Sequence, residues 1–318
     1  MAFEVPEIQQ SQRIANRIGL IDADCVAYWA AAGCDEMVVD AAYKKVRDRM
    51  IMITDQIQTD EIRCYLTGKN NFRNKIATYQ MYKGNRYDKD GNRIKPQPKW
   101  LPQAREYILA NYNSTLCDGY EADDALAMAQ VKCNASQGWE SIISSIDKDL
   151  LIIPGWHHDM NSGYVQHVTE LGQLEIDIKK KVRGNGLKFF YAQLLMGDSA
   201  DWIPGLPKVT PEMKERFDGI KRLGGCGQMA AYHVMHDADS EQELFNRAVW
   251  CYKTYWNGEH WYENWRTGEQ VCPTAMEMLT EQGRLLWMMR EPDTLWEPPL
   301  HLMKGYHEWT KDPADGTT

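Results

Sequence analysis

Acidic residues gather in four short groups along this 318-residue chain, each where an apolar run meets a loop. The four groups are Asp22 with Asp24, Glu121 with Asp123 and Asp124, Asp147 with Asp149, and Asp198 with Asp201. Carboxylates that converge on one point repel one another and raise one another's pKa unless cations neutralise them. Mg²⁺ is the natural counter-ion because it prefers carboxylate and water oxygens. Two such ions about 4 Å apart can flank a phosphate ester, one activating water and the other stabilising the leaving oxygen.

Each group also has an ordinary structural explanation when it is taken alone. Acids in the first turn of a helix are favoured by the helix dipole, which would account for residues 121–124 without any chemistry. Asp147 and Asp149 could form a helix cap and a solvated loop, and Asp198 with Asp201 has a common turn composition. Only the combination of the four groups predicts a site.

The elements between these groups alternate between strands and helices. Apolar runs predict strands at 18–22, 61–67 and 140–146, and the first and third of them end at or next to Asp22 and Asp147. Helices are predicted at 36–59, 102–112 and 121–133. This alternation predicts an α/β fold with a central, mainly parallel sheet flanked by helices. Because the carboxyl ends of parallel strands share one edge, we expect the acidic groups to meet there.

The net charge of −9 argues at first against a polyanionic partner, since phosphate binders are usually basic. The distribution of charge points the other way: residues 63–105 contain eleven Lys and Arg but only Asp88 and Asp90. We interpret the stretch at 68–102, rich in Gly, Asn and Pro, as a long surface loop or mobile helical arch. An acidic pocket beside a basic strip is what a metal-assisted phosphodiesterase needs.

A second, helical unit is predicted to begin near Leu187. The chain is thereby divided into a catalytic domain at 13–186, a helical region at 187–308 and a tail at 309–318. Seven Trp and Tyr residues crowd 250–265; a base-stacking platform is conceivable, but core packing is favoured.

Cysteine spacing and hydropathy exclude several classes of protein. The eight cysteines stand singly, which argues against a zinc site or a disulfide framework and suits a reducing compartment. His157 and His158 have no partner at ligand spacing, and we interpret them as exposed loop. No apolar run is long enough to cross a membrane, and the N-terminus lacks the hydrophobic segment of a secretory signal, so a cytoplasmic location is expected.

Five motifs, in this order, resemble the superfamily of flap endonucleases, 5′–3′ exonucleases and the 5′-nuclease domains of bacterial DNA polymerases. They are LIDAD at 20–24, YKGNR at 82–86, GYEADDALA at 119–127, SSIDKDL at 144–150 and GDSADWIPGLP at 197–207. The likeness covers roughly residues 18–235 and is nearest in character to the bacteriophage exonucleases. It implies a PIN-like nuclease fold with two divalent ions, Mg²⁺ with Mn²⁺ able to substitute.

The resemblance also implies which acids hold the ions. Around the first ion it places Asp22, Glu121, Asp123 and Asp124; in shared positions Asp147 and Asp149; and at the second ion Asp198 and Asp201. Asp24 has no counterpart in many relatives.

The YKGNR motif implies contacts to the substrate. Lys83 and Arg86 match a basic pair that relatives place against the scissile phosphate, where both can stabilise developing charge. Together with Asp22 and Asp147 they form the expected catalytic set. Tyr82 matches a position that stacks on the terminal base, a contact insensitive to base sequence.

The glycine-rich stretch at 223–230 resembles the helix–hairpin–helix element of the family. Gly224, Gly225 and Gly227 would let the backbone approach a duplex phosphate at a helix N-terminus. The chain departs from the pattern in two ways, since residues 206–222 intervene before the turn and Gln228 stands where relatives carry Lys or Arg.

The expected function is a metal-dependent 5′–3′ exonuclease or 5′ flap endonuclease acting on DNA, in phage DNA replication or host DNA degradation. Two rivals remain open at this level: a ribonuclease of the same fold that removes RNA primers, for which an RNA–DNA hybrid would be the partner, and a non-catalytic nucleic-acid-binding scaffold. A third, a protein with structural Ca²⁺ sites, leaves the basic motif unexplained. No membrane partner is expected, and the oligomeric state is left open, a monomer among the options.

Overall fold

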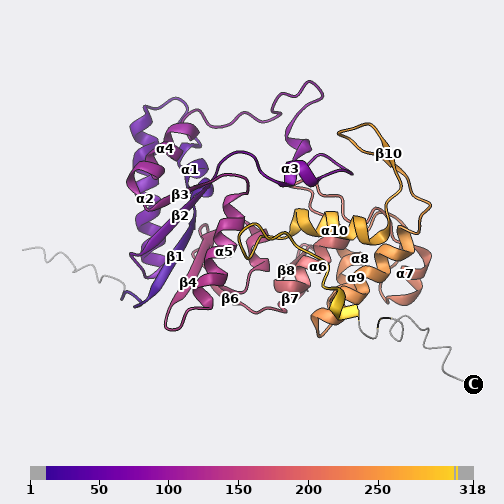
Figure 1. Ribbon diagram of the computed structural model, residues 1–318. Helices are drawn as coiled ribbons and strands as arrows, with labels where there is room; N and C mark the ends of the chain where they lie inside the picture. Colours follow the sequence, from indigo (N-terminus) through magenta and orange to yellow (C-terminus); the bar gives the residue numbers. More distant parts are fainter. Residues whose placement is uncertain (1–11, 304–305, 307–318) are drawn as a thin grey trace, which may run out of the picture.

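A six-stranded sheet forms the centre of the N-terminal half in the computed structural model, which describes residues 12–303 and 306. Its strand order is β3-β2-β1-β4-β5-β6, and all neighbours are parallel except β5 and β6. Its strands are β1 (Arg17–Asp22), β2 (Ile62–Thr67), β3 (Ser114–Cys117), β4 (Glu140–Ser145), β5 (Gly155–Asp159) and β6 (Val165–Val168). The expected central, mainly parallel sheet is confirmed (Figure 1).

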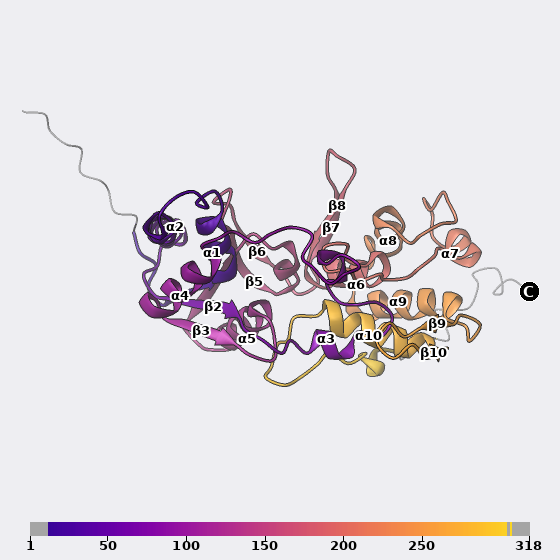
Figure 2. The same cartoon turned by 90° about the horizontal axis from the view of Figure 1, so that it is seen from above.

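Helices cover both faces of this sheet because its central strands are apolar on both sides. In β1, Leu20 belongs to one hydrophobic cluster and its neighbour Ile21 to the other, and both side chains are buried. One face is covered by α1 (Ala23–Ala31), α2 (Val39–Ile57) and α4 (Leu101–Asn111), and the other by α5 (Ala122–Asn134). In the view from above, α1, α2 and α4 lie together at one end of the molecule (Figure 2).

The rest of the chain is mainly helical and packs on the α5 side. The cluster that contains Leu20 and Leu126 continues into Phe190 and Phe245, so the apolar core runs without a break across residue 187. The helices here are α6 (Gly186–Met196), α7 (Pro211–Arg216), α8 (Gln228–Met235), α9 (Glu241–Tyr255), α10 (Ala275–Leu286) and the short η3 (Leu300–Met303). Two hairpins accompany them, β7 (Gln173–Ile176) with β8 (Val182–Asn185) and β9 (Tyr262–Glu263) with β10 (Gln270–Val271). The expected tail at 309–318 lies outside the described residues.

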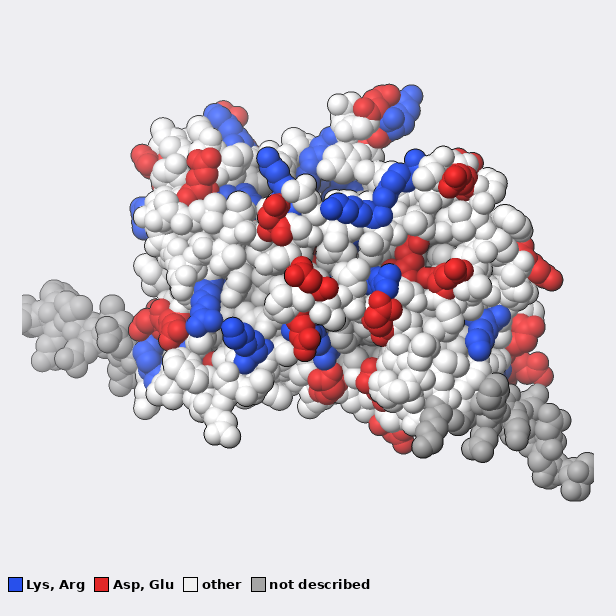
Figure 3. All heavy atoms as spheres, viewed as in Figure 1, with Lys and Arg blue, Asp and Glu red and all other residues white. Residues whose placement is uncertain are grey.

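The basic segment at 68–102, which we call the arch, connects β2 to α4 by a long route. It leaves the sheet, reaches the helical part and returns over the top of the molecule (Figure 1). It carries two short helical turns before α4, namely α3 (Arg73–Ile76) and η1 (Gly84–Arg86). Its first part is fastened to α10, since the backbone N–H of Thr78 donates to Glu281 at 2.9 Å. The expected long surface excursion is therefore present, with one end fixed. On the face in Figure 3, Lys and Arg side chains gather towards the upper rim, where the arch lies.

The interpretation of His157 and His158 as exposed loop is wrong, because both lie in β5 with 4% and 1% of their surface exposed. His157 Nε2 lies 2.7 Å from the carbonyl oxygen of Ile153, and His158 Nδ1 lies 2.7 Å from the hydroxyl of Ser144. Burial lowers the pKa of each imidazole to about 4. Their partners are a backbone carbonyl and a serine on the neighbouring strand, which a search for metal-ligand spacing does not find.

All eight cysteines carry free thiols. Over residues 12–303 and 306, no helix combines the length and the apolar character needed to cross a bilayer.

We predict that the two buried histidines make stability fall on acidification. An unfolded histidine takes up a proton near pH 6.5, whereas these do so only at about pH 4 in the folded protein, so the unfolded state binds more protons in between. Stability should fall by up to roughly 1 kcal/mol per pH unit for each histidine across this window. Urea unfolding at a series of pH values measures the slope, and His157→Gln should make it shallower. An unchanged slope in that variant would contradict the assignment.

Candidate active site

The carboxyl ends of β1 and β4 bring two of the expected acids to one edge of the sheet. Asp22 ends β1 and caps α1 by accepting a hydrogen bond from the Cys25 N–H at 3.1 Å. Asp147 follows β4 and accepts from the Asp149 N–H at 2.9 Å, which caps η2 (Lys148–Ile152). The Ser145 hydroxyl joins the two turns: it donates to Asp22 Oδ2 at 2.6 Å and accepts from the Asp147 N–H at 3.0 Å. The capping role that each acid has locally is thus compatible with a shared site.

The N-terminus of α5 adds Glu121 and Asp123 to the same edge. Burial raises the pKa of Asp123 well above its usual value, and the charges of Asp147, Asp22 and Glu121 add to the effect. Removal from water also raises the pKa of Asp147, more than a hydrogen bond from the Asp149 backbone lowers it, with a further contribution from Asp22. Burial and the Asp147 charge raise the pKa of Asp149 to about 7. These carboxylates lie close enough to repel one another.

Lys83 and Arg86 of the arch form ion pairs with acids of this site. Lys83 Nζ lies 2.5 Å from Glu121 Oε1 and 3.5 Å from Asp201 Oδ2, and Arg86 lies 3.0 Å from Asp201 Oδ1. Burial alone would raise the pKa of Glu121, but the charges of Lys83 and Arg73 outweigh it, so the pKa of Glu121 is lowered. Burial likewise disfavours the Lys83 ammonium, yet its two acidic partners raise its pKa. The basic motif and the acids therefore form one site.

Lys148 holds the second pair of acids, a role that the sequence analysis missed. Its Nζ lies 2.7 Å from Asp149 Oδ1 and 2.6 Å from Asp198 Oδ2. The pKa of Asp198 is lowered overall. Burial alone would raise it, but the hydrogen bond and the charge of Lys148 outweigh burial. Gln193 also donates to Asp149, at 2.7 Å. The signal for Lys148 was its place between two acids in SSIDKDL.

Asp124 does not join the acidic edge, contrary to the role implied by the resemblance. Its side chain is fully buried and forms a two-pronged ion pair with Arg73, at 2.6 and 2.9 Å, while also accepting from the Met289 N–H at 3.0 Å. Both oxygens are thereby occupied by protein donors. Adjacent acids on a helix point about 100° apart, so Asp123 and Asp124 face different surroundings. Asp124 thus pairs with Arg73, whereas Asp123 lies near Asp22, Glu121 and Asp147.

Tyr82 is buried, with 3% of its surface exposed, so its ring cannot stack on a base in this conformation. Its hydroxyl lies 2.8 Å from both Glu121 Oε2 and Asp201 Oδ2 and can donate its single proton to either of them. The role implied by the resemblance is corrected to positioning two acids, since a phenol between carboxylates is held by hydrogen bonds inside the protein. An exposed aromatic side chain is available nearby: Tyr28 of α1 is 52% exposed and lines a cavity with Arg86.

Two other expected features lie away from the acidic edge. Asp24 accepts from the Thr67 N–H at 2.8 Å and pairs with Arg105, which ties α1 to the end of β2 and to α4. Gly224, Gly225 and Gly227 lie in the α7–α8 connection, at the far side of the helical part (Figures 1 and 2).

The acids fit a hard divalent cation by their chemistry. Within residues 12–303 and 306, no three His, Cys, Asp or Glu side chains stand in a metal-holding arrangement, and lysines or arginines engage several of the carboxylates. The donors are nevertheless all carboxylate oxygens, which Mg²⁺ prefers. Burial and the charges of neighbouring carboxylates raise the pKa of Asp123, Asp147 and Asp149, and a bound cation would favour their charged forms.

The fold and this edge define the class: an α/β protein of the 5′-nuclease type, with clustered carboxylates under a basic arch. Residues 18–175 match the family model described as the 5′–3′ exonuclease, N-terminal resolvase-like domain. Residues 18–175 therefore form a domain of this 5′–3′ exonuclease family of nucleases.

Two individual proteins show how far the similarity extends. The chain is 25% identical to DNA polymerase I of Bacillus subtilis (strain 168) over 224 residues, which is 65% of this chain but 24% of the polymerase. It therefore spans about a quarter of that relative's length. A solved structure of the T5 5′-exonuclease with divalent metal ions (zinc) bound has a similar fold, with a TM-score of 0.52 and 13% identity over 85% of this chain and 86% of that one.

We predict opposite effects for two adjacent substitutions in α5. Asp124→Asn should lower the free energy of unfolding by about 3–5 kcal/mol, because Arg73 then loses its buried partner, and should weaken cation binding less than Asp123→Asn does. Asp123→Asn should weaken cation binding and leave stability equal or higher, because it removes a repelled carboxylate. Urea unfolding and calorimetric titration with Ca²⁺ measure the two properties. Equal loss of cation affinity in both variants would show that Asp124 contributes to the cation site as much as Asp123 does.

Proposed function

We propose that this protein is a 5′–3′ exonuclease or 5′ flap endonuclease that hydrolyses phosphodiester bonds at or near the 5′ ends of DNA, using two divalent ions. The observation that carries the proposal is the set of mutually repelling carboxylates at the carboxyl edge of the sheet, directly beneath Lys83 and Arg86. A surplus of buried negative charge favours metal ions, and cations beside it favour a phosphate.

The carboxylates divide into two candidate sets. Asp22, Glu121, Asp123 and Asp147 come from β1, the start of α5 and the end of β4, whereas Asp149, Asp198 and Asp201 surround Lys148 and Lys83. Mg²⁺, with Mn²⁺ as a substitute, is the ion that this donor set suits. When bound, such ions supply activation of water and stabilisation of the leaving oxygen.

Lys83 and Arg86 contribute positive charge to the phosphate. Both pair with acids, and both have flexible side chains that can move to a phosphate once those acids have another counter-charge. Lys83 has a left-handed backbone conformation with φ of 55°, which turns the chain sharply at the start of η1. Tyr82 and Lys83 share Glu121 and Asp201 as partners, so the ring is placed to hold the two acids when the ammonium leaves.

A path for the 5′ strand lies between α1 and the arch. A cavity of about 340 Å³ there is lined by Tyr28, Arg86, Arg93 and Lys95. Three cations suit phosphates and the exposed ring of Tyr28 suits a base face, which gives binding without sequence preference. These residues therefore support action on a single-stranded end that passes beneath the arch.

DNA is the proposed substrate and the duplex is proposed to bind the helical region at 187–308, including its glycine turn. We also propose a role in phage DNA replication or host DNA degradation, in the host cytoplasm. A ribonuclease acting on RNA–DNA hybrids would use the same acids, so an RNA substrate belongs in the test.

We expect release of short 5′ products from a 5′-labelled flap and a 5′-recessed duplex with Mg²⁺, and none with EDTA. Asp147→Ala should reduce the rate by roughly 10²–10³-fold, because it removes a carboxylate from the centre of the cluster. Asp48→Ala, an exposed acid on α2, is the control and should cleave DNA at a similar rate. Cleavage of RNA alone would establish the ribonuclease, and an inactive protein that still binds DNA would establish the non-catalytic scaffold.

We expect Lys83→Ala to lower turnover at saturating DNA by roughly 10²-fold, since its ammonium is assigned to charge that develops on the phosphate. Lys83→Arg keeps the charge and should retain more activity than the alanine variant. Single-turnover kinetics with labelled DNA separate the chemical step from binding. Turnover equal to that of the unmodified protein in Lys83→Ala would exclude this role.

A further inference from the structure

The ammonium group of Lys148 lies directly between two acids of the second carboxylate set. Its Nζ lies 2.7 Å from Asp149 Oδ1 and 2.6 Å from Asp198 Oδ2. These distances are close to the separation of about 2.3–2.6 Å between Ca²⁺ and its oxygen ligands in proteins. The ammonium therefore stands where a cation shared by these two carboxylates would stand.

The two acids are fixed by the fold, whereas the lysine reaches them from the surface. The side chains of Asp149 and Asp198 are 14% and 5% exposed, against 48% for Lys148. Asp198 Oδ1 accepts hydrogen bonds from the backbone N–H groups of Ala200 and Asp201, at 2.6 and 3.2 Å, which leaves Oδ2 for the lysine. A rigid pair of carboxylates is thus occupied by a cation that solvent can reach.

The ammonium also has room to leave the acids. A cavity of about 230 Å³ is lined by Lys148 together with Asp159 and Tyr164. Because the ammonium sits on a flexible four-carbon stem, it can turn away from the acids without a change in the backbone. The ion pairs of Lys148 can therefore be exchanged for another cation while the fold stays intact.

Gln193 of α6 gives an independent indication that a hydrated ion fits between these acids. Its side chain is 1% exposed, and its Nε2 donates to Asp149 Oδ1 at 2.7 Å and lies 3.5 Å from Asp198 Oδ2. Its Oε1 is buried and has no hydrogen-bond partner among the described residues. A buried acceptor without a donor costs free energy, and a water molecule held by an ion between the two acids would supply the donor.

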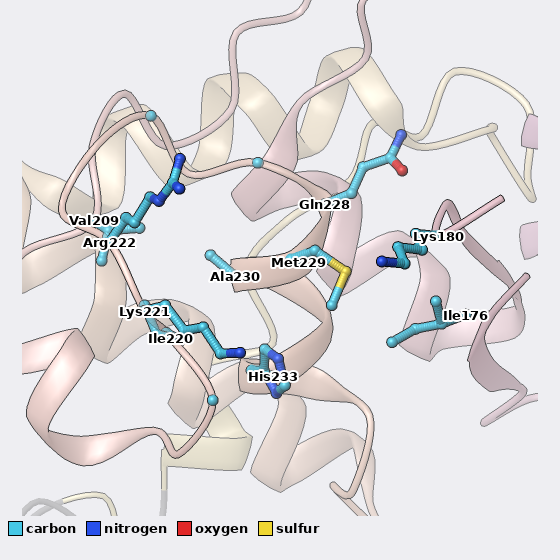
Figure 4. A pocket seen from close by; sticks show the side chains of 13 residues that line it. Ile176, Lys180, Val209, Ile220, Lys221, Arg222, Gln228, Met229, Ala230 and His233 are labelled. Atoms are coloured by element: carbon cyan, nitrogen blue, oxygen red, sulfur yellow. The ribbon is translucent and has the colours of Figure 1, made fainter.

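Other lysines of the helical part lie in a different setting. Lys180 and Lys221 extend into an open groove between the β7–β8 hairpin and α8 (Figure 4). Lys148 instead has two buried carboxylates as its partners, as a bound ion would. The arrangement around Lys148 is therefore that of a cation site, with the cation supplied by the chain.

We propose that Lys148 is a tethered cation, which holds the place of the second divalent ion and gives it up when that ion binds. The inference rests on the proposed function, because it assumes a two-ion site. A short tether keeps the ammonium at a high local concentration, so a free ion has to compete with it. A divalent charge attracts the two carboxylates more strongly than a single charge does, so the ion prevails at sufficient concentration. Lys148 would thereby set how much divalent ion the nuclease requires.

The test is calorimetric titration of the full-length protein with Ca²⁺, for the unmodified chain and K148M. We expect K148M to bind the weaker of two Ca²⁺ ions roughly 10-fold more tightly, because the competing charge is gone. In EDTA, K148M should unfold at a lower urea concentration, since Asp149 and Asp198 lose their counter-charge. Ca²⁺ should then raise its urea midpoint more than that of the unmodified protein. A lysine that only supports the fold would instead weaken cation binding and stability together.

Two control variants accompany K148M. K148R keeps a positive charge beside the acids and should keep the weaker Ca²⁺ affinity. K44M removes a lysine that pairs with Asp48 on the exposed face of α2, so it changes the net charge equally and should leave both Ca²⁺ affinities unchanged. The Mg²⁺ concentration that gives half of the maximal cleavage rate should fall in K148M and stay constant in K44M. If K148M does not fold, K148Q carries the same expectations, because its side chain is neutral and can still donate to the acids.

Unchanged or weaker Ca²⁺ binding in K148M, in a protein that cleaves DNA, would overturn this inference and leave the proposed function standing. Tighter Ca²⁺ binding in K148M, in a protein that cleaves neither DNA nor RNA, would support the tethered cation and contradict the proposed function. If neither the unmodified protein nor K148M binds Ca²⁺, the tethered cation is overturned.

Discussion

A fully buried ion pair between Arg73 and Asp124 joins the two parts of this molecule. Removing two charges from water is costly, and only a complete set of hydrogen bonds offsets that cost. The set is present: the guanidinium also donates to the carbonyl oxygens of Leu285 and Trp287, at 2.9 and 2.7 Å, and the carboxylate accepts from Met289. This ion pair therefore fixes three segments to one point: the start of the arch, the first turn of α5 and the segment after α10.

The acidic edge depends on that point. Asp124 anchors the start of α5 through the Glu121 N–H, at 3.1 Å, so the neighbouring Glu121 and Asp123 are held toward the ends of β1 and β4. Arg73 fixes the beginning of the arch, and ten residues later Lys83 returns to Glu121. A basic loop is thereby held over a group of carboxylates that repel one another. Lysine and arginine pairs compensate part of the charge, while burial and neighbouring carboxylates raise the pKa of Asp123, Asp147 and Asp149.

The secondary structure follows closely from local patterns. The strand expected at 18–22 is β1, that at 61–67 is β2, and the helix expected at 36–59 runs from Val39 to Ile57. The periodicity of apolar residues predicts these helices and strands, because each element must be apolar on the face or faces that it buries. The placement of Asp22 and Asp147 at a shared edge follows from the parallel order of the strands. The contact partners of individual side chains were harder to predict from the sequence. His157 and His158 were assigned to the surface, and the role of Lys148 was not recognised.

Residue types, spacing and motif order were enough to determine the α/β class, the basic arch and the acids from which a site could be built. Which of two adjacent aspartates faces that site was decided only by the tertiary structure, because Arg73 lies 51 residues from Asp124 in the chain and one helical step separates Asp123 from it. The same holds for Tyr82, which is packed in the hydrophobic core and hydrogen-bonded to two acids from distant segments. Burial and counter-charge arise from long-range contacts, and no local pattern encodes them.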